Sequence, residues 1–183
     1  MPAIMRREYK NRVSGVWAAP LVCSAALAVM LSVSGCPYSF TGASVPKHLK
    51  TVAIPLVDDQ SGFGEPGLRE RFTTELTNLF ISDNSLDVAD RINADAMLEG
   101  AITAVTDAPS VVQQGEQVSK RRITVSVKFV FHDMKLRKKV WDKTFSNWGD
   151  YDSGGGLSQR QSGLQEAIKK ITEDILLETV SGW

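Results

Sequence analysis

The sequence is poor in the residues that carry most enzymatic and metal chemistry. Among its 183 residues it has two histidines, His48 and His132, and two cysteines, Cys23 and Cys36. The histidines do not have the spacing of a metal-binding pair, and no serine, histidine and aspartate occur in the order of a catalytic triad. The sequence therefore predicts no catalytic residue, no metal site and no cofactor, and we expect a protein that is not an enzyme.

Cysteine is also too scarce for a disulfide framework. Cys23 lies in an uncharged run, residues 13–35, which follows the basic residues Arg6, Arg7, Lys10 and Arg12. A basic stretch, an apolar stretch and small residues before a cleavage site are typical of a secretory signal. Cleavage after residue 35 removes Cys23 and leaves Cys36 without a disulfide partner in the mature chain. An uncleaved membrane span is the alternative, although Pro20 and the Ser and Gly content near the end of the run weaken it.

The four residues Val33-Ser34-Gly35-Cys36 resemble the lipobox of bacterial lipoproteins. The resemblance implies that the Cys36 thiol is diacylated and that Cys36 becomes the new N-terminus. Several acyl chains on one residue hold a protein firmly on a membrane, whereas a single chain holds it only marginally. We therefore predict that residues 1–35 are a lipoprotein signal peptide and that Cys36 is the lipidation site, with plain secretion as the alternative.

Neither sign of charge dominates the chain. Removal of residues 1–35 takes away four of the 21 basic residues and one of the 21 acidic residues, so the mature net charge is −3. This balance argues against a nucleic-acid partner, which favours a strongly basic domain. The chain also lacks internal repeats, heptads and a second long apolar run. We expect residues 36–48, polar with Gly and Pro, to be a lipidated N-terminus and tether, and residues 49–183 to form a single periplasmic α/β domain.

Apolar alternation predicts four main strands, over residues 51–57, 96–105, 122–131 and 139–148, with a candidate short strand at 86–88. In the first strand Val52, Ile54 and Leu56 share one face, and Pro55 suggests a position at or near a sheet edge. The third is the clearest, with one apolar face formed by Ile123, Val125, Val127, Phe129 and Phe131. One buried and one polar face favour an antiparallel sheet covered on a single side. The polar turn 135–139 predicts a hairpin between the last two strands.

Two amphipathic helices complete the predicted fold. The first has Pro66 in its first turn, ends at 83–85, and carries the apolar residues Leu68, Phe72, Leu76, Leu79 and Phe80. The second opens with a capping box from Ser158 to Gln161, ends before Gly182, and carries Leu164, Ile168, Ile171 and Ile175. We therefore expect an α+β fold, a two-layer α/β sandwich with two helices packed on one face of a roughly four-stranded, mainly antiparallel sheet.

Two further motifs have structural interpretations. Asp58, Asp59 and Glu65 could suggest a carboxylate cluster, but they lie in a glycine-rich loop where Asp and Gly shape turns, and we interpret them as turn residues. The glycines at 154–156 lack the lysine and the spacing of a phosphate-binding loop, so we interpret them as a flexible connection to the second helix.

Two groups of basic residues flank the third predicted strand. The first group consists of Lys120, Arg121 and Arg122, and the second of Lys135, Arg137, Lys138 and Lys139. Such charges commonly guard strand ends against aggregation, which is the interpretation we favour. The alternative is a patch for phosphate-bearing ligands, because arginine and lysine pair strongly with phosphate.

Aromatic residues gather toward the end of the last predicted strand. Trp141 and Phe145 share one strand face and are expected in the core. Trp148 and Tyr151 stand at the start of the glycine-rich loop, and we predict them as partner-interface residues because aromatic side chains often anchor protein contacts.

Several segments resemble the lipopolysaccharide-assembly lipoprotein family, LptE. They are CPYSFTG (36–42), KTVAIPL (50–56), EPGLR (65–69), VADR (88–91) and ADAMLEG (94–100), and the similarity extends through WGDY (148–151). The resemblance implies two helices against a four-stranded sheet, and a lipid-anchored protein that sits inside a large outer-membrane β-barrel, LptD. It further implies that the protein helps this barrel assemble and helps lipopolysaccharide reach the cell surface without a chemical step of its own. Lipopolysaccharide is then the phosphate-bearing ligand expected for the two basic groups.

A second hypothesis is an envelope lipoprotein that regulates a cell-wall synthase or forms part of a secretion assembly. The tether separates the two hypotheses, because about twelve residues reach no further than ~43 Å when fully extended. That reach favours a partner close to the anchoring membrane. The resemblance to LptE implies that this membrane is the outer membrane, with a lipid anchor and a domain that faces the periplasm or the lumen of a barrel.

Overall fold

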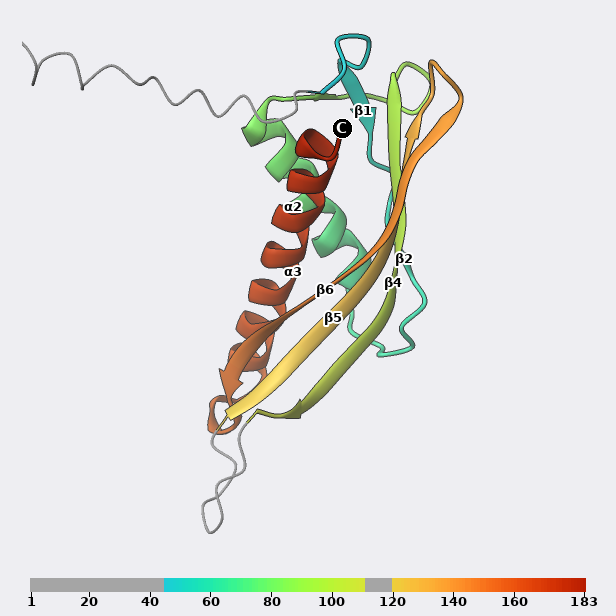
Figure 1. Ribbon diagram of the computed structural model, residues 1–183. Helices are drawn as coiled ribbons and strands as arrows, with labels where there is room; N and C mark the ends of the chain where they lie inside the picture. The colour runs from blue at the N-terminus through green and yellow to red at the C-terminus, as the bar shows by residue number, and fades with distance from the viewer. Residues whose placement is uncertain (1–44, 111–119) are drawn as a thin grey trace, which may run out of the picture. The chain divides into compact units, whose positions relative to one another are not determined.

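Three long strands form the centre of the sheet, at the positions that the apolar alternation predicts. The computed structural model describes residues 45–110 and 120–183, and within them β4 (Ala96–Pro109), β5 (Lys120–Asp133) and β6 (Lys138–Asp152) pair antiparallel in this order (Figure 1). A tight turn at 134–137 joins β5 to β6, which confirms the predicted hairpin. The predicted signal peptide, Cys36 and most of the tether lie outside the described residues.

The inner face of β5 is buried as predicted. Its apolar side chains Ile123, Val125, Val127, Phe129 and Phe131 are all fully buried. The alternate residues, among them Ser126 and Lys128, lie on the opposite face, where Ser126 Oγ pairs with Ser146 Oγ at 3.0 Å across the strands. The period of two in the sequence therefore sets which face of the sheet meets the core.

Short parallel strands complete the sheet: β3 (Asp87–Val88) confirms the candidate strand at 86–88, and β2 (Asp58–Asp59) is a strand that was not predicted. β1 (Thr51–Ala53) pairs parallel with both β3 and β4, and β2 pairs parallel with β4. The sheet has six strands in the order β3-β1-β4-β5-β6, with β2 beside β4. It is therefore a mixed sheet, antiparallel in its long pairings and parallel in its short ones.

The predicted strand over residues 51–57 is interrupted where Pro55 stands. β1 ends at Ala53 and pairing resumes only at Asp58, because proline has no N–H to donate to a sheet. The predicted common face of Val52, Ile54 and Leu56 does not extend to its last residue: Ile54 is half-buried and packs against the core, but Leu56 is 50% exposed and Val57 is buried instead. The predicted position at or near a sheet edge agrees with the structure, since only the two-residue strand β3 lies outside β1.

The first predicted helix is α2 (Leu68–Asp83). It buries Leu68, Phe72, Leu76 and Phe80, one residue per turn, and it ends at Asn84, whose φ of 59° closes the helix in the left-handed region. Its first residue follows Gly67, which has a φ of 70°. Pro66 therefore precedes the helix instead of standing in its first turn.

The second predicted helix is α3 (Gly156–Ser181), and it begins earlier than expected. The chain leaves β6 through a 3₁₀ turn, η1 (Ser153–Gly155), and enters the helix at once. Ser158 thus lies inside the first turn, and no side-chain hydrogen bond caps the helix at Gly155, so the predicted capping box is wrong. The predicted apolar residues Leu164, Ile168, Ile171 and Ile175 are all buried, and Gly182 caps the C-terminus as expected.

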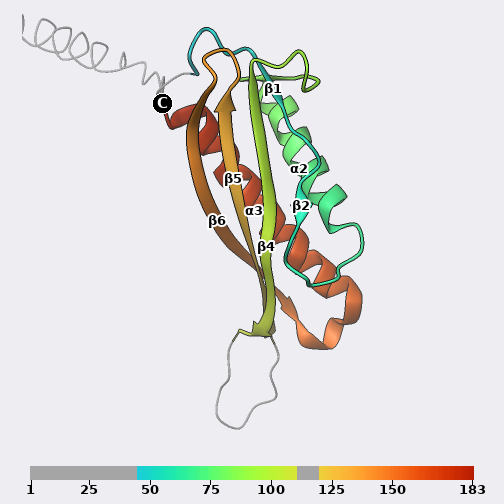
Figure 2. The same ribbon diagram turned by 90° about the vertical axis from the view of Figure 1, so that its right-hand side faces the viewer.

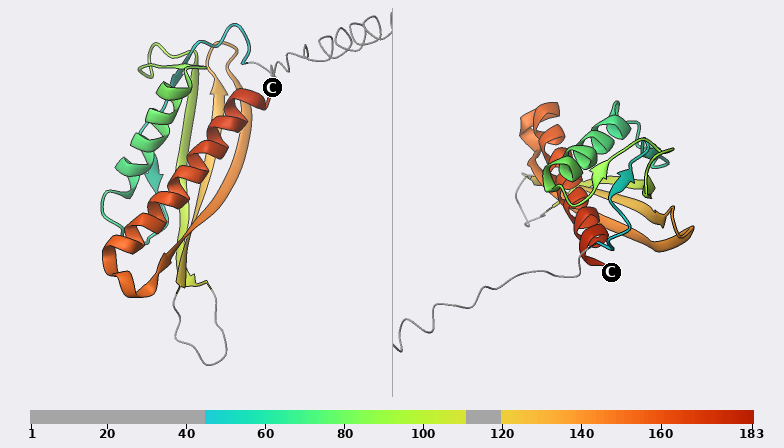
Figure 3. Two further views of the ribbon diagram at one scale, coloured as in Figure 1. Left: turned by 90° about the vertical axis from the view of Figure 1, so that its left-hand side faces the viewer. Right: turned by 90° about the horizontal axis from the view of Figure 1, so that it is seen from above.

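Both helices cover the same face of the sheet (Figure 3). Their buried side chains and the inner face of the sheet form one hydrophobic core, in which Phe72 of α2 stacks on Phe129 of β5. α3 also lies against β6, close enough that a Cβ at Gly149 would clash with the backbone of Gly163. The predicted two-layer α+β sandwich is therefore confirmed, with more strands than expected.

The two ends of the domain carry different segments. At one end lie residues 45–50, the loop 89–95 and residues 133–138 around the β5–β6 turn (Figure 2). We call these residues the entry end, because the described chain enters the domain there at Val45. Val45 packs against the core and His48 Nε2 lies 2.6 Å from Asp133 Oδ2, so residues 45–48 pack on the domain. The start of β5 and the start of α3 lie at the opposite end (Figure 1).

Candidate functional site

Most of the first basic group is engaged within the fold. Arg121 Nε donates to Asp107 Oδ1 at 2.8 Å. Arg122 makes two parallel hydrogen bonds to the Asp150 carboxylate, at 2.7 and 2.9 Å. Lys120 is exposed and has no ion-pair partner within residues 45–110 and 120–183. The structure therefore supports a structural role for Arg121 and Arg122, whereas Lys120 makes no direct ion pair and its charge only helps to lower the pKa of Asp150.

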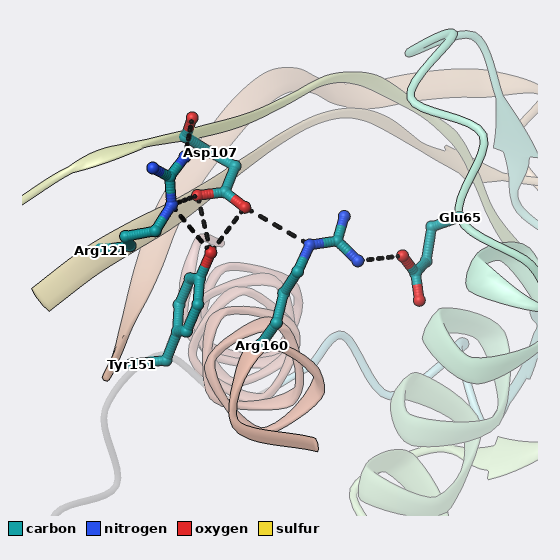
Figure 4. Close-up of polar contacts among 5 residues, drawn as sticks. All are labelled: Glu65, Asp107, Arg121, Tyr151 and Arg160. Carbon is teal, nitrogen blue, oxygen red and sulfur yellow. Dashed lines mark hydrogen bonds and ion pairs between the residues drawn. The ribbon is translucent and has the colours of Figure 1, made fainter. Parts of the chain in front are cut away.

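Arg121 belongs to a cluster of polar side chains at the opposite end, Glu65, Asp107, Arg121, Tyr151 and Arg160 (Figure 4). The Tyr151 hydroxyl donates to Asp107 Oδ2 at 2.7 Å, and Arg121 Nε donates to the Tyr151 oxygen at 3.0 Å. Arg160 bridges Asp107, at 3.4 Å, and Glu65, at 2.7 Å. We call these five residues the Asp107 cluster, and they join β4, β5, β6, α3 and the loop before α2.

The electrostatics of the Asp107 cluster favour the ionised carboxylate. Burial by itself raises the pKa of Asp107, but the hydrogen bond from Tyr151 and the hydrogen bond and charge of Arg121 lower it more, with a further contribution from Arg160. The pKa of Asp107 therefore lies below its ordinary value of 3.8. Burial and the neighbouring Asp107 raise the pKa of the Tyr151 hydroxyl, which stays protonated and donates. Sequence reasoning missed this cluster, because Glu65, Asp107 and Arg160 are far apart in the chain.

The two predicted interface aromatics have different environments. Tyr151 is buried and its hydroxyl belongs to the Asp107 cluster, so a role for Tyr151 at a partner interface stays a prediction that this environment does not favour. Trp148 is 44% exposed on the sheet face that the helices leave uncovered. The Arg122 guanidinium lies 4.8 Å from the centroid of the Trp148 ring, and the Lys170 ammonium lies 5.8 Å from it. Lys170 also donates a hydrogen bond to the backbone oxygen of Trp148. Trp148 is thus an exposed aromatic side chain held in a fixed position.

The second basic group lies at the entry end, away from the first group. Lys135 pairs with Asp95 at 2.9 Å, and Lys139 pairs with Asp142 at 3.2 Å. Arg137 and Lys138 are exposed, and neither has an ion-pair partner in the described part of the chain. Because the two groups stand at opposite ends of the β5–β6 hairpin, they do not form one patch.

A shallow groove on the uncovered face of the sheet was not predicted. It encloses about 390 Å³ and its lining includes Leu56, Glu99, Ala101, Lys128 and Val130. The groove exists because pairing stops between β1 and β2, which leaves Leu56 half exposed beside β4. Pro55 was the sequence signal for this interruption, although it does not show what the released side chains would border.

The remaining predicted motifs have structural roles. Asp59 Oδ1 accepts hydrogen bonds from the backbone N–H of Ser61 at 2.9 Å and from its hydroxyl at 2.6 Å, which confirms the turn interpretation for Asp59. The interpretation is wrong for Glu65, which forms ion pairs with Arg71 and Arg160. Within residues 45–110 and 120–183, no three His, Cys, Asp or Glu side chains come close enough together to hold a metal ion. None of the described helices is both long and apolar enough to span a membrane.

Comparison with known structures supports the fold. Protein XCC0632 from Xanthomonas campestris matches with a TM-score of 0.56 at 12% identity, over 76% of this chain and 91% of that one. The hypothetical protein CT253 from Chlamydia trachomatis matches with a TM-score of 0.53 at 10% identity, over 71% of this chain and 95% of that one. Identities this low show a shared fold and nothing further.

The family assignment comes from the sequence itself. Among curated proteins, none matches the chain. A family model described as LptE, Lipopolysaccharide-assembly, matches residues 49–179, which include every described helix and strand except the last residues of α3. This match spans well over half of the chain, so the chain belongs to the LptE family of lipopolysaccharide-assembly proteins.

Proposed function

We propose that this protein is an outer-membrane lipoprotein that partners a large β-barrel translocon and helps lipopolysaccharide reach the cell surface. The observation that carries the proposal is the family match over residues 49–179. In this role the protein is a plug and assembly factor for a barrel similar to LptD, and it performs no chemical step. Cys36 anchors it through acyl chains, and the domain faces the periplasm or the barrel lumen.

The uncovered face of the sheet is the surface we propose for the barrel contact. It carries Trp148, whose ring is held by Arg122 and Lys170, and the groove beside Leu56. Exposed aromatic side chains fixed by neighbours lose little conformational entropy on binding, and such residues contribute most of the energy in many interfaces. The polar residues around them, such as Ser126 and Ser146, suit the rim of such an interface.

Lipopolysaccharide contacts remain proposed for the members of the two basic groups that make no direct ion pair in the described part of the chain, Lys120, Arg137 and Lys138. A charge-assisted contact with phosphate contributes roughly 1.5–3 kcal/mol, so loss of one contact weakens binding by about tenfold or more. Reversal of these three residues to Glu should weaken binding of purified protein to lipopolysaccharide by at least this factor. Arg122→Glu, which breaks an internal ion pair instead, is the comparison variant, and circular dichroism checks the fold of both.

Affinity purification tests the barrel partnership directly. Tagged protein is recovered from detergent-solubilised envelopes of cells that make it, and the co-purified proteins are identified by mass spectrometry. We expect one large β-barrel protein in near-equal amount, and less of it with Trp148→Glu than with Leu177→Glu. Leu177 is a suitable control because it is exposed on α3, in the helical layer. Recovery of a cell-wall synthase or a secretion assembly without a barrel would contradict the proposal.

A further inference from the structure

The entry end presents three apolar side chains to solvent. Ile92 is 94% exposed, Leu136 is 65% exposed and Met134 is 42% exposed. They come from two loops that are far apart in sequence. A backbone hydrogen bond joins the loops, from the Met134 N–H to the Asp95 carbonyl oxygen at 2.8 Å. Single exposed apolar residues are common on protein surfaces, whereas a group at the tips of adjoining loops usually marks a contact surface.

These loops are held in place by buried and charged contacts. Asp133 is 3% exposed, accepts a hydrogen bond from the Leu136 N–H at 2.8 Å and lies 2.6 Å from His48. Lys135 Nζ contacts Asp95 at 2.9 Å and donates to the backbone oxygen of His48 at 2.7 Å. The chain entering the domain, the loop 89–95 and the β5–β6 turn therefore form one framework, and the apolar tips project from it in a fixed arrangement.

The charge of the entry end is opposite in sign to that of the predicted mature chain. Residues 45–50, 89–95 and 133–138 contain six Lys and Arg against three Asp, whereas the mature chain has a net charge of −3. Two of the three acids form contacts within this end, Asp95 with Lys135 and Asp133 with His48. The third, Asp90, is exposed to solvent. Lys47, Lys50, Arg91, Arg137 and Lys138 are exposed and have no ion-pair partner among the described residues. Exposed apolar tips within a basic surrounding are the combination that binds an anionic bilayer surface.

Only a short segment separates the proposed anchor at Cys36 from this end of the domain. Val45 is nine residues after Cys36, and nine residues span at most ~32 Å when fully extended. A domain held this closely meets the bilayer repeatedly, so even weak contacts act at high effective concentration.

We propose that the entry end docks on the bilayer that holds the anchor. Ile92, Met134 and Leu136 enter the boundary between headgroups and acyl chains, and Arg137 and Lys138 contact phosphates of anionic phospholipids. This inference rests on the proposed lipidation of Cys36. Docking adds a second attachment to the acyl chains and fixes the orientation of the domain, with the Asp107 cluster pointing away from the membrane.

A fluorescent label that reports a lipid environment tests the docking. The full chain is purified in its processed, lipidated form and reconstituted into vesicles of phosphatidylethanolamine and phosphatidylglycerol without lipopolysaccharide. Leu136→Cys and Leu157→Cys each carry an environment-sensitive dye, and a spin-labelled phospholipid serves as quencher. Leu157 is the matched control because it is 64% exposed, nearly as much as Leu136, but lies at the start of α3 at the opposite end.

We expect a blue-shifted, quenched label at position 136 and neither effect at position 157. We then add the replacements Arg137→Gln and Lys138→Gln to the Leu136→Cys variant. Each charge near an anionic surface contributes roughly 1 kcal/mol, so the loss of both should lower the ratio of docked to undocked protein by about 30-fold. Circular dichroism checks that the variants fold.

Three results overturn the inference: equal quenching at both positions, no quenching at either, or quenching at 136 only after lipopolysaccharide is added. An unchanged ratio in the double variant removes the proposed phosphate contacts. Failure of the proposed anchor is detected separately, because the chain without an added cysteine then takes up dye at its unacylated Cys36.

Discussion

Asp107 shows how a single side chain decides the local structure at the opposite end of the domain. It accepts hydrogen bonds from Tyr151 and Arg121 and contacts Arg160, and these three residues come from β6, β5 and α3. A half-buried carboxylate is costly unless its hydrogen-bonding capacity is used, and here both of its oxygens are used. The same contacts explain why the pKa of Asp107 lies below its ordinary value despite burial.

We predict that Asp107→Asn lowers the free energy of unfolding at neutral pH by about 1.5–3 kcal/mol, the usual contribution of hydrogen bonds to a charged group. Because the pKa of Asp107 is lowered in the folded state, its stabilising effect is present above the unfolded value of 3.8 and is lost as the pH falls through the folded value. The difference between wild type and variant should therefore shrink from neutral pH to about pH 3. Urea titrations at the two pH values measure it.

Asp150→Asn is the control for this prediction. Asp150 also has a lowered pKa, chiefly through its hydrogen bond with Arg122, but both of these side chains are more than a third exposed. Exposed ion pairs contribute about 0–1 kcal/mol, so Asp150→Asn should change the stability much less than Asp107→Asn. A stability difference for Asp107→Asn that stays constant with pH would show that the carboxylate charge is not what stabilises the cluster.

At the scale of elements, the contact of α3 with β6 depends on two glycines. A Cβ on Gly149 would clash with the Gly163 backbone, whereas a Cβ on Gly163 would meet Tyr151 and Gly149 at 3.3–3.4 Å, a tight contact that a shift of a few tenths of an ångström would relieve. The backbone of β6 therefore approaches the helix directly at Gly149, and neither backbone can move without opening the core.

We predict that Gly149→Ala lowers the free energy of unfolding by about 1–3 kcal/mol, as overpacking does. Gly163→Ala should be neutral or should stabilise by up to about 1 kcal/mol, because alanine is the better helix former. Chemical denaturation of both variants measures the contrast. Similar losses of stability in the two variants would mean that α3 does not lie against β6 in this way.

The two faces of β5 give a second contrast at this scale. Val127 is fully buried against the helices, whereas Ser126 lies on the uncovered face and pairs with Ser146. An unpaired charge in the core costs several kcal/mol, comparable with a total stability of about 5–15 kcal/mol. We therefore predict that Val127→Asp unfolds the domain and that Ser126→Asp is tolerated, as circular dichroism during heating would show. Equal melting temperatures would contradict this assignment of the faces.

At the scale of the whole molecule, the proposed anchor decides where the domain can act. We predict that Cys36→Ala abolishes acylation and releases the protein from the membrane, or mislocalises it within the envelope, because the thiol is the proposed attachment point. Labelling with radioactive palmitate and fractionation of the envelope measure both effects. Label on the Cys36→Ala protein, or none on the wild type, would contradict the lipobox interpretation.

Periodicity made much of the fold predictable from the sequence. The alternation along β5 and the i, i+4, i+7 spacing along α3 each assign buried residues without knowledge of any distant contact, because side-chain direction follows from local backbone geometry. The turns at 134–137 and at Asn84 were predictable from their polar residues, because these favour turns through local backbone preferences. The Asp107 cluster was not, since nothing in a sequence states that residues 65, 107, 121, 151 and 160 meet.

The sequence by itself determined the layers, the inward faces and the family of this protein, all of which depend on local pattern. Only the tertiary structure decided which cations are available for binding. Arg121 and Arg122 look like exposed phosphate ligands in the sequence, yet Asp107 and Asp150 pair with them across the strands. Arg137 and Lys138 carry the same charge in a similar local setting, and the structure leaves them unpaired beside Leu136. The difference arises because the energy of a charge depends on its neighbours in space, and strand pairing sets these neighbours.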